Sequence, residues 1–194
     1  MKKIVWTFGL AAAFGIIACN DAGRTDSVKQ AEDSNAAKAK SDSMPMPVDK
    51  ASADFAVEAA HGGMMEVALG KLAQEKGMNN RVKDFGAMMI TDHTAADDKL
   101  KMIASSKNIT LPDGLSEGAK KSLEDLQKKT GRDFDKAYIG MMESDHKKDV
   151  DAFMKASQNL TDPELKTFAT ETLPVLQKHL DSVTAINNSL KGKK

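Results

Sequence analysis

The chain has 194 residues, with 28 basic and 28 acidic side chains, four histidines and one cysteine. A formal net charge of zero and only 5% aromatic residues argue against a nucleic-acid-binding protein, which would carry a basic patch and stacking side chains. A single cysteine excludes an internal disulfide and the paired-cysteine spacing of zinc fingers.

The first residues have the pattern of an export signal. Lys2 and Lys3 precede an apolar run over 4–17, which is shorter than the about 20 residues that a membrane-spanning helix needs. The run ends in Ile-Ile-Ala-Cys at 16–19, which resembles a lipobox, where the cysteine is acylated and becomes the mature N-terminus. We therefore predict a lipoprotein signal peptide over 1–18 and a membrane anchor on Cys19. The alternative is an ordinary signal peptide with an unrelated cysteine.

The segment over 19–50 is rich in Ser, Ala, Asp and Lys and has almost no large aliphatic side chains. Such a segment buries too little apolar surface to offset the entropy lost on ordering. We predict a disordered tether here, carrying the lipidated Cys19 and leading to a folded domain over 51–194.

From residue 52 onward the apolar side chains recur with a helical period. Long helices are expected over 52–76, 81–107, 133–159 and 161–190, and a short helix over 116–129. Two hairpins follow from the short links between the first and second long helices and between the third and fourth.

The link between the second and third long helices is different, because it contains an extended piece over 108–114 and the short helix. Together these can run back along a bundle of about 40 Å. The predicted fold class is all-α, a ferritin-like four-helix bundle with a long crossover that contains a short extra helix. A five-helix up-and-down array is the alternative.

One polar residue interrupts the apolar stripe of each long helix. The four are Glu66, His93, His146 and His179. At 1.5 Å per residue, all four lie about 18 to 27 Å from an end of the bundle, so they share one level near its middle. Buried polar groups cost about 1–3 kcal/mol each unless they are paired or bind an ion.

Three imidazoles and a carboxylate suit a transition metal such as Fe, Zn or Cu and do not suit Mg or Ca. The alternative is that the histidines are core residues satisfied by carboxylates, hydroxyls and water. His61 lies off the stripe and is expected at the surface, and the charged run over 147–149 is expected to form a solvated helix face.

A motif, Met-Met-x-x-Asp-His, occurs at 88–93 and again at 141–146. It suggests that the two hairpins derive from a duplicated unit. Asp92 and Asp145 directly precede the histidines, so each is expected to point elsewhere and to act only as an outer group that orients a ligand. The methionines are expected to fill the core, with thioether contacts to copper as the alternative.

Glu143 and His146 form a Glu-x-x-His pair, the arrangement with which di-iron ferritin-like bundles hold iron, so Glu143 joins the candidate ligands. The chain from about 52 to 190 also resembles an exported bacterial ferritin-like family known as domain of unknown function 4142. The resemblance rests on the region of Glu66 and on the segments 91–93, 144–146 and 173–179. It implies a ferritin-like fold and export, but no established activity.

The di-iron pattern is incomplete elsewhere. Ile90 and Leu176 stand three residues before His93 and His179, where a complete pattern would have Glu. The sequence also lacks a phosphate-binding Gly loop and a serine nucleophile motif.

The leading hypothesis is therefore a non-catalytic or weakly redox-active metal-binding lipoprotein of the cell envelope, facing the periplasm or the cell surface. A stress or scaffold protein with structural histidines is the second hypothesis, and a di-iron oxidase is the third.

Overall fold

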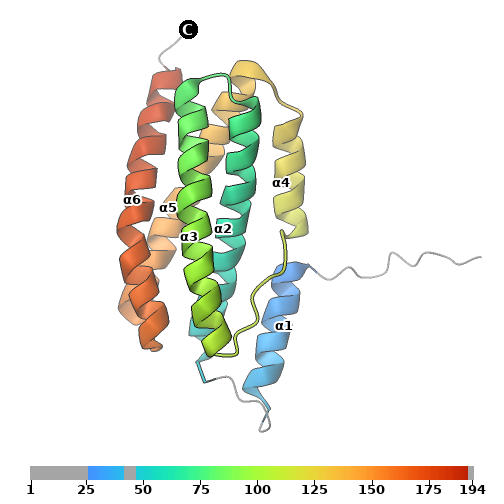
Figure 1. Ribbon diagram of the computed structural model, residues 1–194, viewed down its shortest axis with the longest axis vertical. Helices are drawn as coiled ribbons and strands as arrows, with labels where there is room; N and C mark the ends of the chain where they lie inside the picture. Colours follow the sequence, from blue (N-terminus) through green and yellow to red (C-terminus); the bar gives the residue numbers. More distant parts are fainter. Residues whose placement is uncertain (1–25, 42–46, 192–194) are drawn as a thin grey trace, which may run out of the picture.

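The structure is a computed structural model that describes residues 26–41 and 47–191; the predicted signal peptide and Cys19 lie outside these ranges. The described chain is all-helical. The helices are α1 (Ser27–Ala39), α2 (Lys50–Lys76), α3 (Asn80–Ser106), α4 (Glu117–Gln127), α5 (Gly131–Asn159) and α6 (Pro163–Lys191). The long helices α2, α3, α5 and α6 form a four-helix bundle, and α1 and α4 lie along its side (Figure 1).

Short polar side chains begin the helices where the sequence predicts a start. Asp49 Oδ1 accepts a hydrogen bond of 3.0 Å from the Ser52 amide at the beginning of α2. Asp162 Oδ1 accepts one of 3.0 Å from the Leu165 amide, and Pro163 is the first residue of α6. These caps give a hydrogen-bond partner to backbone amides that have none within the helix. The long helices begin and end within a few residues of their predicted bounds.

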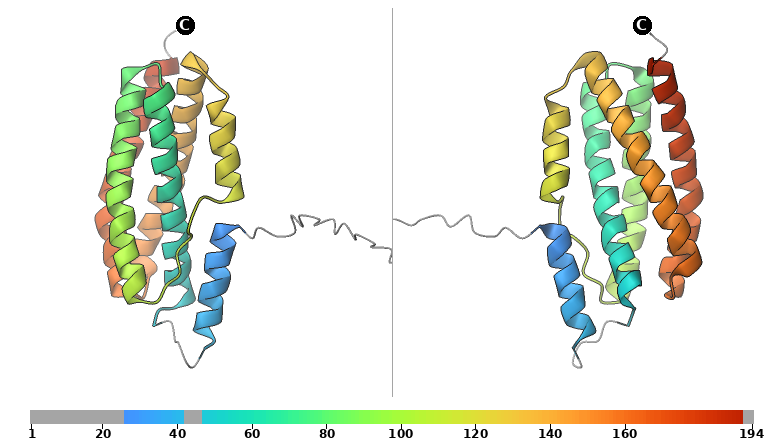
Figure 2. Two further views of the ribbon diagram at one scale, coloured as in Figure 1. Left: turned by 45° about the vertical axis from the view of Figure 1, so that its right-hand side comes forward. Right: turned by 180° about the vertical axis from the view of Figure 1, so that it is seen from behind.

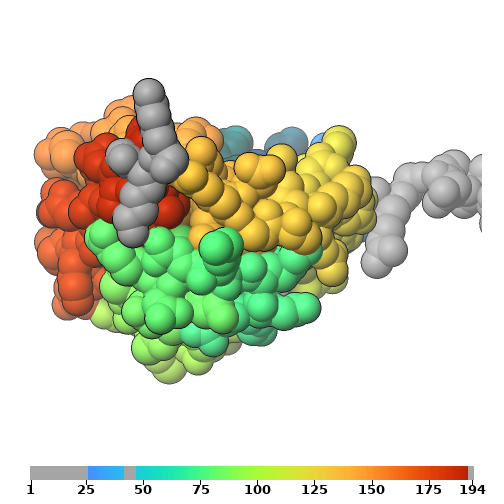
Figure 3. Space-filling view, turned by 90° about the horizontal axis from the view of Figure 1, so that it is seen from above, coloured from blue at the N-terminus to red at the C-terminus, as the bar shows by residue number. Residues whose placement is uncertain are grey.

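The connectivity is that of a bundle with one long crossover. The pairs α2–α3 and α5–α6 pack as antiparallel hairpins, and α2 also packs against α5 and α3 against α6. After α3 the chain returns along the bundle through an extended segment and α4, so that α5 begins at the end where α3 began (Figure 2). Viewed from that end, α4 covers the side of the bundle away from α6 (Figure 3). The predicted fold class is confirmed, and the five-helix array is wrong.

The prediction of a disordered tether over 19–50 is wrong for α1. Its Asn35 is buried and pairs with the crossover, because its Nδ2 donates to the Thr110 carbonyl oxygen (2.9 Å) and its Oδ1 accepts from the Thr110 amide (2.7 Å). Asp26 caps α1 and also accepts a hydrogen bond of 2.9 Å from the Glu117 amide at the start of α4. These polar contacts hold the helix against the crossover and α4, and a count of apolar residues does not detect them.

Two glycines allow α2 and α3 to approach closely. A Cβ atom on Gly70 would lie 2.7 Å from the Gly86 carbonyl oxygen, and one on Gly86 would lie 2.8 Å from the Gly70 carbonyl oxygen. Neither position tolerates a side chain without separating the helices. This close packing fixes the side chains of α2 and α3 relative to each other, including those that face the centre of the bundle.

The apolar core is divided into two clusters, one toward each end of the bundle. The first includes Leu100, Phe153 and Phe168, and the second includes Phe85, Tyr138 and Met142. On every long helix the predicted polar residue lies between the segments that supply the two clusters. The core therefore contains a polar layer at mid-height. In the described ranges, no helix combines the length and apolar character needed to cross a membrane.

Candidate metal centre

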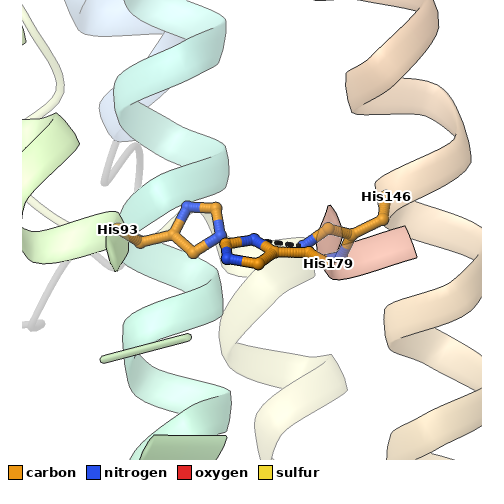
Figure 4. Close-up of side chains that lie close together, drawn as sticks. All are labelled: His93, His146 and His179. Carbon is orange, nitrogen blue, oxygen red and sulfur yellow. Dashed lines mark hydrogen bonds between the residues drawn. The ribbon is translucent and has the colours of Figure 1, made fainter. Parts of the chain in front are cut away.

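Three helices bring the imidazoles of His93, His146 and His179 together in the polar layer. One ring nitrogen of each lies within 4.8 Å of one ring nitrogen of the other two. The ring centroids are 5.3 to 5.7 Å apart, and His146 and His179 are fully buried. Figure 4 shows the rings of His93 and His146 approaching His179 from opposite sides.

Each imidazole places one ring nitrogen against a protein oxygen. His146 Nδ1 lies 3.0 Å from the Met142 carbonyl oxygen, which can only accept. His179 Nε2 donates to Asp92 Oδ2 at 2.8 Å. His93 Nδ1 lies 2.9 Å from Glu66 Oε2 in an ion-pair contact. Metal-binding histidines commonly donate their second nitrogen to a carboxylate or a carbonyl in this way, which fixes the tautomer and the ring orientation.

The remaining nitrogens of the three rings are therefore lone-pair acceptors. His146 Nε2 and His179 Nδ1 lie 3.3 Å apart, a hydrogen-bond distance that is drawn as a dashed line in Figure 4. A hydrogen bond between them requires one ring to carry a proton on both nitrogens, and burial disfavours that charged form. His93 Nε2 is buried and has no hydrogen-bond partner. Burial lowers the pKa of each of the three imidazoles below its ordinary value, which favours the neutral rings. Three neutral imidazoles that present lone pairs to one small volume are the donor set of a nitrogen-ligated metal site.

Glu66 links the histidines and is the only carboxylate of the predicted four-residue set. Its Oε2 pairs with His93, and its Oε1 lies 3.3 Å from His146 Nδ1 without a hydrogen bond. Burial raises the pKa of Glu66 to about 7, although the His146 imidazole acts in the opposite direction. The structure thus brings Glu66, His93, His146 and His179 together.

Glu143 does not join this group, and the Glu-x-x-His pair is not a ligand pair. Its Oε1 accepts a salt bridge of 2.8 Å from Lys147 and its Oε2 accepts a hydrogen bond from Asn187. These two partners lower the pKa of Glu143. On α5 the carboxyl group at 143 turns toward Asn187 of α6 and solvent, whereas His146 faces the centre. The sequence spacing alone does not reveal this difference.

Two further carboxyl groups lie close to the site, and neither was predicted from the sequence. Asp149 belongs to the charged run over 147–149, yet one of its oxygens lies within 4.8 Å of ligand atoms of Glu66 and His146. Burial raises the pKa of Asp149 to about 8 and that of Asp97 to about 6. The available signal was helical spacing: Asp149 follows His146 by three residues, and Asp97 follows His93 by four, so each shares a face with its histidine.

The aspartates that precede the histidines have different partners. Asp92 orients His179 through the bond of 2.8 Å, in agreement with its expected role as an outer group. Asp145 Oδ1 instead pairs with Lys148 at 3.0 Å, and its Oδ2 is buried without a partner. His61 is half-buried, and its Nε2 lies 2.9 Å from Ser116 Oγ at the start of α4.

The repeated motif does not follow the order of the hairpins. One copy lies on α3, the second helix of its hairpin, and the other on α5, the first helix of its hairpin. A hairpin duplicated in order would have put both copies on corresponding helices. The buried Met89 and Met142 belong to the second hydrophobic cluster, as expected for methionines that fill the core.

Fold and site together define an all-α four-helix bundle with a histidine–carboxylate group at its centre. The chain belongs to the family described as Domain of unknown function (DUF4142), whose model matches residues 35–186. The match begins within α1, which agrees with the packing of that helix against the bundle.

Among solved structures, the chain is similar to one described as the crystal structure of a DUF305 fragment from Deinococcus radiodurans. The TM-score is 0.65 at 10% sequence identity, and the match covers 74% of this chain and 99% of that chain. At this identity the likeness shows a shared helical fold. No curated protein matches the chain.

Proposed function

We propose that this domain binds one transition-metal ion through His93, His146 and His179. The observation that carries the proposal is the convergence of three buried ring nitrogens whose lone pairs face one another, each ring being oriented by an oxygen acceptor on its other nitrogen. An ion replaces mutual repulsion of the lone pairs with three coordinate bonds.

The spacing suits a tetrahedral ion. Two nitrogens bound at about 2.0–2.1 Å to a tetrahedral Zn²⁺ are about 3.3 Å apart. His146 Nε2 and His179 Nδ1 are separated by 3.3 Å. The His93 nitrogen, within 4.8 Å of the other two, completes the set after a modest rotation of its side chain. Zn²⁺, Fe²⁺ and Cu²⁺ all accept imidazole ligands.

The proposed setting is the cell envelope, with the bundle anchored through a lipid on Cys19. The support is the basic start, the apolar run and the Ile-Ile-Ala-Cys sequence at 16–19. Incorporation of labelled palmitate into the wild-type chain, and its loss in Cys19→Ala, is the expected outcome. Equal incorporation in both chains, or none in either, would reject the anchor.

The metal proposal is tested on the full chain, purified with an affinity tag that contains no histidine. After removal of bound metals by a chelator, equilibrium dialysis against Zn²⁺ followed by elemental analysis should give one bound ion per chain. His93→Gln and His179→Gln should each lower the affinity by at least about tenfold. This expectation follows from the loss of one of three nitrogen ligands.

His61→Gln is the matched control, because it removes the remaining histidine of the chain without altering the three convergent rings. It should bind Zn²⁺ as the wild type does. Wild-type protein without stoichiometric metal after reconstitution would reject the proposal and favour structural histidines, and so would undiminished binding by His179→Gln.

A further inference from the structure

A surface groove between α2 and α5 combines apolar walls with acidic side chains. Its volume is about 400 Å³, which lies in the range of sites for small organic ligands. The rings of Phe55 and Phe153 line it and pack edge to face, with centroids 5.0 Å apart. The short helix α4 begins beside His61 and continues toward the end of the bundle where α5 begins. No residue of α4 lines the groove, so the groove is left uncovered.

Carboxyl groups outnumber basic groups in this groove. The acidic residues that line it, all in the described part of the chain, are Glu58, Glu66, Asp145 and Asp149. Lys148 also lines it, but its side chain is 74% exposed and its amine pairs with Asp145 Oδ1 at 3.0 Å. Lys148 acts on Asp149 as well, yet one lysine does not balance four carboxyl groups. The groove therefore attracts a cation.

Two carboxylate oxygens of these groove residues are buried and accept no hydrogen bond. They are Glu66 Oε1 and Asp145 Oδ2. Glu66 is only 4% exposed, and its other oxygen contacts His93. A proton on Asp149 can be donated to Glu66, but it leaves the Asp145 oxygen without a donor. Buried acceptors of this kind are unfavourable, and a ligand with several N–H groups would satisfy them.

The spacing of Glu66 and Asp149 suits an ammonium group. One carboxylate oxygen of Glu66 and one of Asp149 lie within 4.8 Å of each other. Two oxygens that each accept at about 2.8 Å from one tetrahedral ammonium nitrogen are about 4.6 Å apart. A single ammonium group can therefore donate to a carboxylate of α2 and to one of α5.

Gly62 keeps the α2 side of the groove open. It lies in the middle of the helix and lines the groove, and a Cβ atom there would meet no atom within 4 Å. The next residue, Gly63, is different, because its Cβ would lie 2.2 Å from Asp97 Oδ1. Glycine is unfavourable in a helix interior, and packing does not require it at position 62. A larger side chain there would fill the groove, so the glycine preserves space for a ligand.

We propose that this groove binds a small organic ammonium ion, a primary amine with an apolar body. The ammonium group would lie between Glu66 and Asp149, and the apolar body against Phe55 and Phe153. The groove continues inward to a cavity of about 30 Å³ that His93 lines, since Glu66, Asp149 and Phe153 line both. The amine would lie next to the three histidines without replacing any of them as a metal ligand.

The test is isothermal titration calorimetry of the full chain with phenethylammonium, in a buffer that contains a chelator. The expected result is one ligand per chain with a Kd near or below about 1 mM. Phenethyl alcohol, the neutral analogue, should bind at least about tenfold more weakly, because it cannot donate charge-assisted hydrogen bonds. No binding of phenethylammonium at millimolar concentration, or equal binding of the alcohol, would overturn the proposal.

Two variants locate the ligand. Gly62→Leu should abolish binding by filling the groove. Gly140→Leu is its matched control, because a Cβ at Gly140 also meets no atom within 4 Å but Gly140 lies outside the groove. Asp149→Asn should weaken binding by at least about tenfold through loss of a charged acceptor. Asp98→Asn and Asp151→Asn, at exposed positions outside the groove, should leave binding unchanged.

Circular dichroism establishes that each variant is folded. Unchanged binding of phenethylammonium in folded Gly62→Leu, or in folded Asp149→Asn, would overturn the proposal.

The groove does not depend on the proposed function, and the two proposals can fail separately. His179→Gln removes a ligand of the histidine site but no group of the groove, so it should lose Zn²⁺ and bind phenethylammonium as the wild type does. Loss of the amine in folded His179→Gln would place it at the histidines and overturn the groove proposal. Retained Zn²⁺ binding would contradict only the histidine site.

Discussion

His146 Nε2 and His179 Nδ1 lie 3.3 Å apart in the core, although each ring already directs its other nitrogen to a protein oxygen. Two neutral imidazoles in this arrangement present lone pairs to each other. A buried acceptor without a donor costs about 1–3 kcal/mol. For two neutral rings the arrangement is therefore unfavourable by itself, and under the proposed function a cation between the rings removes this cost.

Asp92→Asn should weaken Zn²⁺ binding without affecting the fold. The carboxylate of Asp92 accepts the Nε2–H of His179 and so directs Nδ1 toward the site. Loss of such an orienting group lowers metal affinity about 10- to 100-fold. Competition with a chromophoric chelator measures the affinity, and Asp98→Asn is the control. An affinity equal to the wild type would show that the bond does not orient the ligand.

His179→Leu should abolish stabilisation by Zn²⁺ while leaving the metal-free protein at least as stable as the wild type. The substitution removes one of two opposed lone pairs from a fully buried position. A ligand at about 100 times its dissociation constant stabilises by about 2.7 kcal/mol, which raises the melting temperature of the wild type by about 5–10 °C.

Thermal unfolding with a chelator and with Zn²⁺ measures both effects. A metal-free His179→Leu protein that is less stable by more than about 2 kcal/mol would indicate a structural hydrogen bond. That outcome would favour the scaffold hypothesis.

Gly86→Ala should destabilise the bundle by about 1–3 kcal/mol, because overpacking a tight contact forces the backbone to shift. The new methyl group would lie 2.8 Å from the Gly70 carbonyl oxygen. Gly140→Ala is the matched control: its Cβ meets no atom within 4 Å, so it should be stabilising by up to about 1 kcal/mol through helix propensity. Denaturant unfolding compares the two, and equal effects would contradict the close approach of α2 and α3.

The metal-free protein should become more stable as the pH falls from about 9 toward 6.5. Burial raises the pKa of Asp149 to about 8 and that of Glu66 to about 7. A carboxyl group whose pKa is higher in the folded state binds its proton more tightly there, so stability is lost as the pH rises through that pKa. The three imidazoles, whose pKa is lowered, act oppositely below about pH 6.5.

Melting temperatures in a chelating buffer at pH 6.5 and 8.5 test this dependence. Asp149→Asn should reduce the difference between the two pH values, and Asp151→Asn, a change at an exposed position of the same helix, should leave it unchanged. A melting temperature that rises from pH 6.5 to 8.5 in the wild type would contradict the assignment of buried, proton-binding carboxyl groups.

The sequence predicts the bundle well because its helices depend on local signals. Apolar periodicity, the Asp162-Pro163 start and the Gly77 stop determine where the long helices begin and end. The link between the second and third long helices is long enough to run back along the bundle. That length favours a four-helix bundle with one long crossover over a five-helix up-and-down array. The helix α1 was not predicted. It packs against the crossover through two hydrogen bonds between the Asn35 side chain and the Thr110 backbone, and these two residues are far apart in the sequence.

The centre was only partly predictable for a related reason. Each long helix that carries a site histidine has that residue within its apolar stripe. A polar residue in such a stripe can be recognised from the sequence alone. The three histidines are His93, His146 and His179. Glu143 was misassigned, because the i, i+3 spacing does not specify the direction of a side chain at the edge of a stripe. Asp97 and Asp149 were missed because each resembles a surface charge until Gly63 and the packing of α2 against α5 define a cavity.

A crystal structure of the Zn²⁺-loaded protein, with anomalous data at the zinc edge, tests the central claim most directly. The account predicts an anomalous peak at about 2.0–2.1 Å from His93 Nε2, His146 Nε2 and His179 Nδ1. A map without a peak among these three nitrogens, or with zinc only at His61 or the surface, would contradict it.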